Sequence, residues 1–172
     1  MPGVRVLSGA PFGGDVPILR DKIYMRIALH LAKRAALMGE VPIGAVVVQD
    51  DDVIAWAYNE KEKNQDATHH AELLVLQRAA DYLGRWRLSD ATLYCTLEPC
   101  AMCAGAMINA RLGRLVFGAK DLKAGAAGSI LDVVRYQFLN HQVETCEGVL
   151  KEECSDLLSS FFSDLRRDGR VG

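Results

Sequence analysis

The residues best able to do chemistry lie in two short strings, His70-Ala71-Glu72 and Cys100-Ala101-Met102-Cys103. Cysteines at positions i and i+3 of a helix lie on one face about one turn apart, so both sulfurs can reach one metal ion. In the first turn of a helix, the free N–H groups and the helix dipole favour the thiolate form that binds metals. The spacing therefore predicts that Cys100 and Cys103 are metal ligands.

His70 is the third candidate ligand, because it opens the helix that precedes the cysteine helix. Consecutive helices of neighbouring strand–helix units begin at the same edge of a sheet, where such folds bind ligands. Three protein ligands leave tetrahedral zinc one open position for water, whereas structural zinc is normally closed by four. Zinc brings the pKa of that water near neutrality, and Glu72 is the natural carrier of its proton to a base and then to a departing amine. The pattern predicts hydrolytic deamination with one zinc ion, Zn(2+), per subunit.

Each string has a plainer interpretation when it is taken alone. A cysteine pair opening a helix can be a redox pair, and a histidine two residues before a glutamate occurs by chance. The two strings together, with Pro99 at the expected helix start, favour the metal site. His69 could compete with His70, but a neighbouring ring points elsewhere, so we interpret His69 as a polar loop residue. His30, on a helix, and His141, in a loop, have no second ligand nearby in the sequence.

Hydrophobic periodicity predicts the elements that position these strings. Helices are expected over residues 21–38, 70–83, 99–110 and 150–167. The first of them follows from Ile23, Ile27 and Leu31, which recur at four-residue spacing before Gly39. Strands are expected over residues 43–49, 53–58, 91–97, 114–117 and 143–146. This order predicts an α/β fold, a five-stranded mixed sheet covered by helices and built partly from parallel crossovers.

Length and composition set the domain organisation. A chain of 172 residues, 50% of them hydrophobic, fits one domain with a substantial core. Residues 1–20 hold three of the 5 prolines and four of the 15 glycines without periodicity, so we expect a flexible leader there. Residues 21–172 would then form the zinc-dependent deaminase domain.

Composition also bounds the location and the partners. No apolar run approaches the roughly 20 residues that cross a bilayer, and no apolar signal core is present, so we expect a soluble cytoplasmic protein without membrane contact. In such a chain Cys95, Cys146 and Cys154 are expected to be buried thiols. The formal net charge of −2 gives no overall attraction to a polyanion, so a nucleic acid would need a local basic patch.

Both strings fit the zinc deaminase signature H-x-E with P-C-x-x-C. Together with the longer strings from Thr96 to Ala106 and from Gly118 to Ser129, they closely resemble bacterial tRNA-specific adenosine deaminases of the cytidine deaminase superfamily. The resemblance covers about residues 22–167. It implies a three-layer α/β/α cytidine-deaminase-like fold around the central five-stranded mixed sheet, and a homodimer. It also implies conversion of adenosine to inosine at the first anticodon (wobble) position of an arginine tRNA, bound by its anticodon stem-loop.

The resemblance implies roles for individual residues as well. His70, Cys100 and Cys103 match the zinc ligands, and Glu72 matches the proton shuttle. Among the residues that match substrate-binding positions, Asn59 would contact the flipped nucleotide, and Ile43 and Ala71 would line the base pocket. Asp121 and Lys123 fall in the RNA-facing loop. Phe161 falls in the closing helix, together with Phe162, Arg166 and Arg167. His69 and the acidic loop over residues 59–66 depart from the family pattern.

A local excess of basic residues predicts where RNA lies. The cations Arg111, Arg114, Lys120, Lys123 and Arg135 share their segment with only Asp121 and Asp132. A phosphate backbone crossing this segment could place one loop nucleotide over the zinc, because the segment follows the cysteine helix. An unpaired anticodon base suits such a site, since flipping it out costs less than in a duplex. The plainer interpretation is a solvated face.

Two other functions remain open at this point. A zinc deaminase of a free nucleobase such as guanine or cytosine would use the same metal ligands, although the Gly118 to Ser129 string favours tRNA. A non-catalytic RNA-binding subunit could keep zinc for structure alone. Glu72 argues against that alternative, because a scaffold has no need of a proton shuttle.

Overall fold

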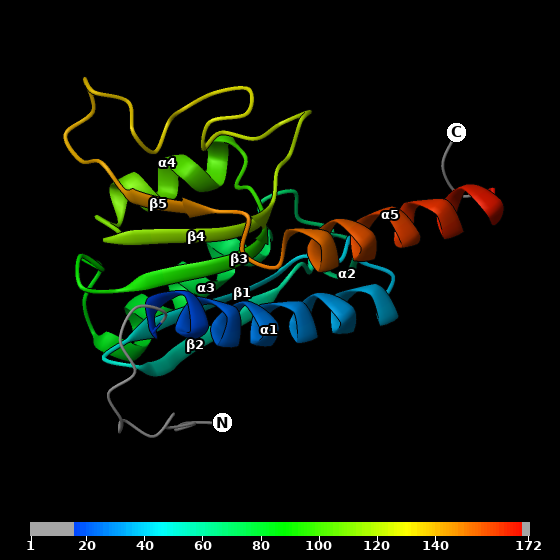
Figure 1. Ribbon diagram of the computed structural model, residues 1–172, viewed down its shortest axis with the longest axis horizontal. Coiled ribbons are helices and arrows are strands. Elements are labelled where there is room, and N and C mark those ends of the chain that lie inside the picture. The colour runs from blue at the N-terminus through cyan, green and yellow to red at the C-terminus, as the bar shows by residue number, and fades with distance from the viewer. Residues whose placement is uncertain (1–15, 170–172) are drawn as a thin grey trace.

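The computed structural model describes residues 16–169, in which helices enclose a single sheet (Figure 1). Along the chain the elements are α1 (Val16–Leu37), β1 (Gly44–Gln49), β2 (Asp52–Tyr58), α2 (Lys61–Asn64), α3 (Ala71–Leu83), β3 (Thr92–Leu97), α4 (Ala101–Asn109), β4 (Arg114–Ala119), β5 (Glu144–Glu147) and α5 (Lys151–Arg167). The hairpin between β1 and β2 turns at Asp50 and Asp51, whose φ angles of 51° and 65° suit a tight type I′ connection. Aspartate tolerates this left-handed backbone better than most residues.

The sheet has the strand order β2-β1-β3-β4-β5. Strand β1 is antiparallel to both β2 and β3, whereas β3, β4 and β5 are mutually parallel. The expectation of a five-stranded mixed sheet with a parallel alternating part is therefore confirmed. Because β3 and β4 are parallel, the segments that follow both of them begin at the same edge.

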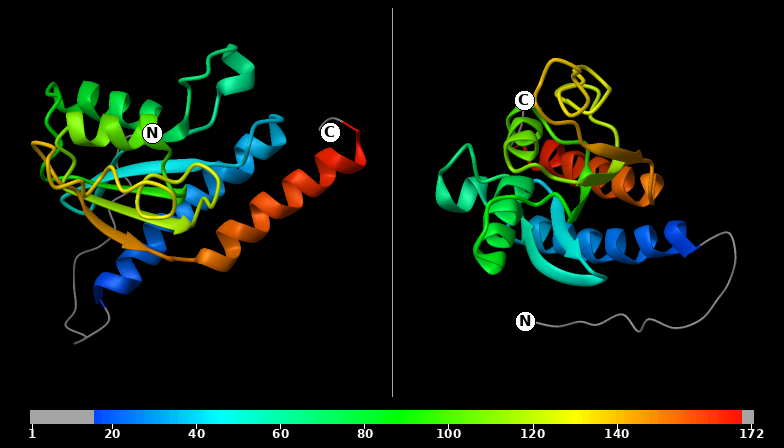
Figure 2. Two further views of the ribbon diagram at one scale, coloured as in Figure 1. Left: turned by 90° about the horizontal axis from the view of Figure 1, so that it is seen from above. Right: turned by 90° about the vertical axis from the view of Figure 1, so that its left-hand side faces the viewer.

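Two layers of helices bury the two faces of the sheet. Helices α3 and α4 pack on one face, and α1 and α5 pack on the other (Figure 2). This arrangement confirms the three-layer α/β/α fold. Contact between α1 and β1 is close at Gly44, where an added Cβ would lie 2.0 Å from the Ala28 carbonyl oxygen. Within residues 16–169, no helix combines the length and apolar character that crossing a bilayer requires.

The start of α1 differs from the expectation. The helix begins at Val16, so the predicted boundary after residue 20 falls inside it, and residues 16–20 belong to the helix. Pro17 is compatible with this start, because the missing N–H of a proline in the first turn has no helical partner to lose. The remainder of the predicted leader, residues 1–15, lies outside the described residues.

Candidate active site

Two helix starts bring the predicted ligands together. His70 is the N-cap of α3 and Cys100 is the N-cap of α4, both with extended backbone and neither with a capping hydrogen bond from its side chain. Helix α4 thus begins after Pro99 rather than at it. An N-cap side chain naturally turns toward the third residue of its helix, which in α4 is Cys103. The i, i+3 spacing therefore works through cap geometry rather than through one face of a continuous helix.

The ligand atoms stand at distances that suit one zinc ion. His70 Nδ1 lies 3.6 Å from Cys100 Sγ and 3.6 Å from Cys103 Sγ. Zinc–sulfur and zinc–nitrogen bonds of about 2.3 and 2.1 Å at a tetrahedral angle separate the two ligand atoms by about 3.6 Å. All three ligand atoms lie within 4.8 Å of one another. The residues present therefore fit a tetrahedral metal ion with three protein ligands.

The two thiols differ in how readily they ionise. Hydrogen bonds from the Cys103 thiol and from His70 lower the pKa of Cys100 to about 3, so Cys100 is a thiolate at neutral pH. The same hydrogen bond, together with burial, raises the pKa of Cys103. A metal ion binds both cysteines as thiolates, so metal binding here would release a thiol proton.

Glu72 is the only carboxylate on α3 within the first turn, and it is almost fully buried, with 2% of its surface exposed. Burial raises the pKa of Glu72 to about 7. Among the residues that the structure describes, none makes a hydrogen bond to Glu72 Oε2. A buried carboxylate oxygen that the protein leaves unbonded beside a metal site suits contact with water or substrate.

Three predicted substrate-binding residues lie beside His70 on one side. Asn59 is buried, and its side-chain oxygen accepts a hydrogen bond of 3.0 Å from the Ala71 backbone N–H. Asn59 therefore supplies the cap that His70 does not give to α3. The Asn59 N–H donates to the Ile43 carbonyl at 3.1 Å, and both Ile43 and Ala71 are buried. The structure thus brings Ile43, Asn59 and Ala71 together beside the metal ligand.

Glu98, for which the sequence predicts no role, holds the loop beside the candidate site. It is 1% exposed, and its two oxygens accept hydrogen bonds of 3.0 Å from the backbone N–H groups of Asp121, Ala127 and Ser129. The Ser129 hydroxyl donates a further one. Burial alone would raise the pKa of Glu98, but these hydrogen bonds outweigh it and lower the pKa. Its place between a buried strand and Pro99 is the one sequence signal, since a charge there must find partners.

The loop over residues 120–131 is thus fastened next to the cysteines. Gly125 packs on Glu98 so tightly that an added Cβ would lie 2.5 Å from the Glu98 carboxyl carbon. The Asp121 carboxylate accepts hydrogen bonds from the backbone N–H groups of Lys123 and Ala124, whereas the Lys123 side chain is exposed. Asp121 therefore shapes the loop, and Lys123 is presented to solvent.

Phe161 occupies a different place from the other predicted site residues. It lies on α5 and lines a cavity of about 690 Å³ that also includes Leu37, Val41, Glu62 and Phe162. This cavity lies between α5 and the C-terminal end of α1 and includes none of the three metal ligands. The structure therefore does not bring Phe161 together with the metal site.

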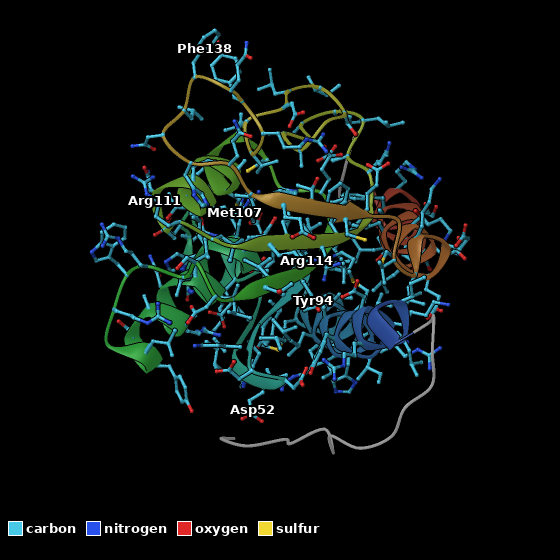
Figure 3. The ribbon with its side chains drawn as sticks, turned by 60° about the vertical axis from the view of Figure 1, so that its left-hand side comes forward. Asp52, Tyr94, Met107, Arg111, Arg114 and Phe138 are labelled. Atoms are coloured by element: carbon cyan, nitrogen blue, oxygen red, sulfur yellow. The ribbon has the colours of Figure 1, made fainter. Side chains whose placement is uncertain are left out.

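The basic segment predicted to meet RNA is largely neutralised. Arg114 binds Asp21 through two hydrogen bonds of 2.8 Å, and Tyr94, beside it in Figure 3, donates to the same carboxylate. The other three engaged cations are Lys120, with Glu147, Arg135, with Asp132, and Arg111, with Asn140. Only Lys123 of the five lacks such a partner among the described residues. Most of these partners lie outside the segment, so a local charge count overstates the free positive charge there, and the contact of the segment with RNA stays a prediction.

The other histidines and cysteines agree with their plainer interpretations. His69 is held by Asn64 at 2.9 Å and by Asp66 at 3.2 Å, as a polar loop residue would be. His141 contacts the Leu112 carbonyl oxygen at 2.7 Å. Cys95 and Cys154 are buried, whereas Cys146 is only partly buried, contrary to expectation, because it lies on the edge strand β5.

Comparisons with known proteins agree with the fold and the site. A model of the MafB19-like deaminase family matches residues 19–166. A tRNA-specific adenosine deaminase of Bacillus subtilis is 49% identical over 148 residues, which is 86% of this chain and 92% of that protein. The enzyme of the same name from Haemophilus influenzae is 45% identical over 152 residues, 88% of each chain.

Solved structures place the chain in the same group. A structure from a study of A-to-I editing by tRNA:A34 deaminases at the wobble position of transfer RNA has a TM-score of 0.76 and 41% identity, over 79% of this chain and 99% of that chain. Guanine deaminase from Nitrosomonas europaea, at 19% identity and a TM-score of 0.72, over 92% of this chain and 99% of that one, shares the fold. The fold and site thus define a deaminase. Within that class, the chain belongs to the family of the tRNA-specific adenosine deaminases.

Replacing Glu98 tests how the loop is held. Glu98→Ala leaves three backbone N–H groups without their acceptor, and each lost partner costs about 1–3 kcal/mol. We expect the amides of Asp121, Ala127 and Ser129 to exchange hydrogen at least about thirtyfold faster, measured by NMR or mass spectrometry. Glu147→Ala is the matched control, because it removes only an exposed ion pair with Lys120. Unchanged protection in Glu98→Ala would contradict the assignment.

Proposed function

We propose that this chain catalyses hydrolytic deamination of adenosine to inosine at the wobble position of a tRNA anticodon, most specifically that of an arginine tRNA. One observation carries the proposal: three metal-ligand atoms that fit zinc stand beside a buried, unbonded carboxylate oxygen of Glu72. The identity of 49% and 45% to two tRNA-specific adenosine deaminases supports the choice of substrate.

In this proposal His70, Cys100 and Cys103 would hold one zinc ion, which would supply Lewis acidity to activate a water molecule near neutral pH. Glu72 accepts the proton of the attacking water and passes it to a ring nitrogen of the base. Glu72 then takes the second proton from the oxygen that has bonded to the ring carbon and gives it to the amino group as the carbon–nitrogen bond breaks. Adenosine and water thus give inosine and ammonia. A carboxyl group with a pKa of about 7 suits both directions of transfer, because it gains and loses a proton with similar ease.

We propose that the remaining site residues bind and orient the nucleotide. Ile43, Asn59 and Ala71 form the wall against which the flipped base rests, and the contact of Asn59 with the nucleotide falls to its amide NH₂, since its oxygen binds Ala71. Asp121 shapes the loop that borders the site, and Lys123 offers a cation to the RNA backbone. Phe161 would meet nucleotides farther from the zinc. A tRNA substrate implies that the enzyme works in the cytoplasm.

We also propose a homodimer. Large apolar side chains are exposed between β4 and β5, with Phe138 at the outer end of this segment (Figure 3). They are Leu122, Ile130, Leu131, Tyr136, Phe138 and Leu139. A monomer seldom exposes so many large apolar groups in one segment, and a second copy would cover them.

The competing functions have less support. A deaminase of free guanine or cytosine would need no RNA surface, and the guanine deaminase comparison concerns the fold alone. A structural zinc protein would not need a buried carboxylate next to the metal ligands, because that group is costly to bury without a partner.

An inosine assay on arginine tRNA with an adenosine at the wobble position tests the reaction. We expect the purified protein to form inosine, and Glu72→Gln to lower kcat by at least about a hundredfold, because the amide cannot carry the proton. Zinc content and the melting temperature should stay near those of the unsubstituted protein. Activity on free guanine or cytosine without inosine in the tRNA would favour the free-base enzyme, and full activity of Glu72→Gln would refute the role of Glu72.

Metal analysis tests the cofactor. We expect about one zinc per chain in the freshly purified protein, and removal by a chelator should abolish inosine formation until zinc is returned. Cys103→Ser should lower zinc occupancy strongly, whereas Cys146→Ser, a cysteine outside the site, should leave it unchanged. Purified, active protein without zinc would overturn this assignment.

Sedimentation tests the assembly. A homodimer sediments with twice the chain mass of 18.8 kDa, and we expect Leu131→Ser combined with Phe138→Ser to shift the mass toward the monomer. Leu37→Ser, which replaces an exposed apolar residue at the end of α1, is the control and should leave the dimer intact. A single species of 18.8 kDa at micromolar concentration would contradict the proposal.

A further inference from the structure

Helix α1 carries a row of basic side chains along its outer side. Lys22, Arg26, His30 and Lys33 are separated by four, four and three residues, so they lie on one face of the helix. We call these four residues the α1 stripe. From Lys22 to Lys33 they are the only exposed residues, because all the others are buried or partly buried. In Figure 1, α1 lies in front of the sheet, and no described element passes over it.

The stripe has no acid bound to it. Among residues 16–169, no carboxylate lies within ion-pair distance of Lys22, Arg26, His30 or Lys33. The single acid of α1, Asp21, is buried and bonded to Arg114 and Tyr94. Glu153 of α5 is the one acid that lines the shallow cavity beside Arg26, His30 and Lys33.

The stripe leads away from the metal site. Lys33 lies near the C-terminal end of α1. Soon after this helix, Glu40 accepts hydrogen bonds from the backbone N–H groups of Glu62 and Lys63. These two residues belong to the segment that leads to His70, so this end of α1 is the end nearer the site. Lys22 lies one residue from Asp21, which reaches Arg114 at the opposite end of β4. With a rise of 1.5 Å per residue, the row extends about 16 Å from the site edge.

We propose that the α1 stripe binds the phosphate backbone of the tRNA on the side away from the inserted anticodon base. This inference rests on the proposed function, which supplies the tRNA. The three cations of the stripe, Lys22, Arg26 and Lys33, lie in a line that matches a row of phosphates. Phosphate contacts fix orientation without reading sequence. A membrane surface fits less well, because no apolar side chain is exposed between Lys22 and Lys33 to enter a bilayer.

The stripe also resolves a conflict of charge. The net charge of −2 would repel a polyanion, and four of the five cations in the segment from Arg111 to Arg135 are engaged within the protein. Arg34, next to Lys33, turns instead toward the rings of Trp56 and Tyr58, at 5.9 and 5.5 Å from their centres. The α1 stripe therefore offers phosphate three exposed cations, Lys22, Arg26 and Lys33, that pair with no carboxylate among the described residues.

The test compares two double variants that change the net charge equally. Arg26→Gln with Lys33→Gln removes two stripe cations. The control, Arg85→Gln with Arg87→Gln, removes two cations between α3 and β3. There Arg85 is paired with Asp90, and Arg87 lies over Trp86. Equilibrium binding of full-length arginine tRNA is measured across salt concentrations. We expect the stripe variant to bind about tenfold more weakly near 0.15 M salt, with a salt slope smaller by about 1 to 2, and the control to match the unsubstituted protein.

Three further measurements separate the possible causes. Inosine formation at saturating tRNA should proceed at an unchanged kcat in the stripe variant, because the zinc ligands and Glu72 are untouched, and Arg26→Lys with Lys33→Arg should restore binding. Equal loss of affinity in the stripe and control variants would overturn the stripe in favour of a net-charge effect. Unchanged tRNA binding with loss of binding to phosphatidylserine vesicles would assign it to a membrane instead. Normal tRNA binding without inosine in the unsubstituted protein would refute the proposed function alone.

Discussion

The separation of 3.6 Å between His70 Nδ1 and each cysteine sulfur is the constraint on which the architecture around the site depends. It requires α3 and α4 to begin at the same edge, which the parallel pairing of β3 and β4 provides. It also places a histidine and a cysteine at N-cap positions, where a serine or aspartate would stabilise the helix by about 1 kcal/mol. For α3, Asn59 compensates by accepting the free N–H of Ala71. In α3 the candidate metal ligand and the capping side chain are thus different residues, His70 and Asn59.

Buried carboxylates hold the segments on both sides of the ligands. Glu40 accepts from the backbone N–H groups of Glu62 and Lys63, and Glu98 accepts from those of Asp121, Ala127 and Ser129. Because these bonds use backbone N–H groups, the outward side chains of both segments stay available to meet a substrate. Hydrogen bonds from several donors offset the cost of burying a charged carboxylate. Glu72 lacks such a donor at one oxygen, so its burial favours the protonated form. Opposite surroundings therefore separate the carboxylates that build the site from the one that can do chemistry.

The parts that the sequence predicts are those that local spacing determines. Ligand identity follows from neighbours such as Cys100 and Cys103, and the elements follow from periodicity in short windows. The role of Glu98 is not predictable in this way, since its partners lie 23 to 31 residues later and meet it only through backbone N–H groups. The sequence predicts that the first helix begins at Asp21, whereas α1 begins at Val16. Residues 16–20 lack the apolar periodicity that marks the rest of the helix, so the pattern does not reveal them. The roles of Asn59, Ala71 and Lys123 in substrate binding rest on resemblance, and no contact within the chain determines them.

Which basic residues are free to bind a partner depends on the fold and cannot be read from a count of charges in the sequence. Arg114 looks available in the sequence, yet Asp21, 93 residues earlier, binds it from α1. The same bond uses the only acid of α1, so the cations on the outer side of that helix remain without an intrahelical partner. The ion pair between α1 and β4 thus neutralises Arg114, which belongs to the segment from Arg111 to Arg135. It also leaves the basic residues on the outer side of α1 without an acid on their own helix. A chain with a net charge of −2 can in this way present a positive surface to a polyanion, because the field near a surface depends on its nearest unpaired charges, and more distant charges are screened within about 8 Å at physiological salt.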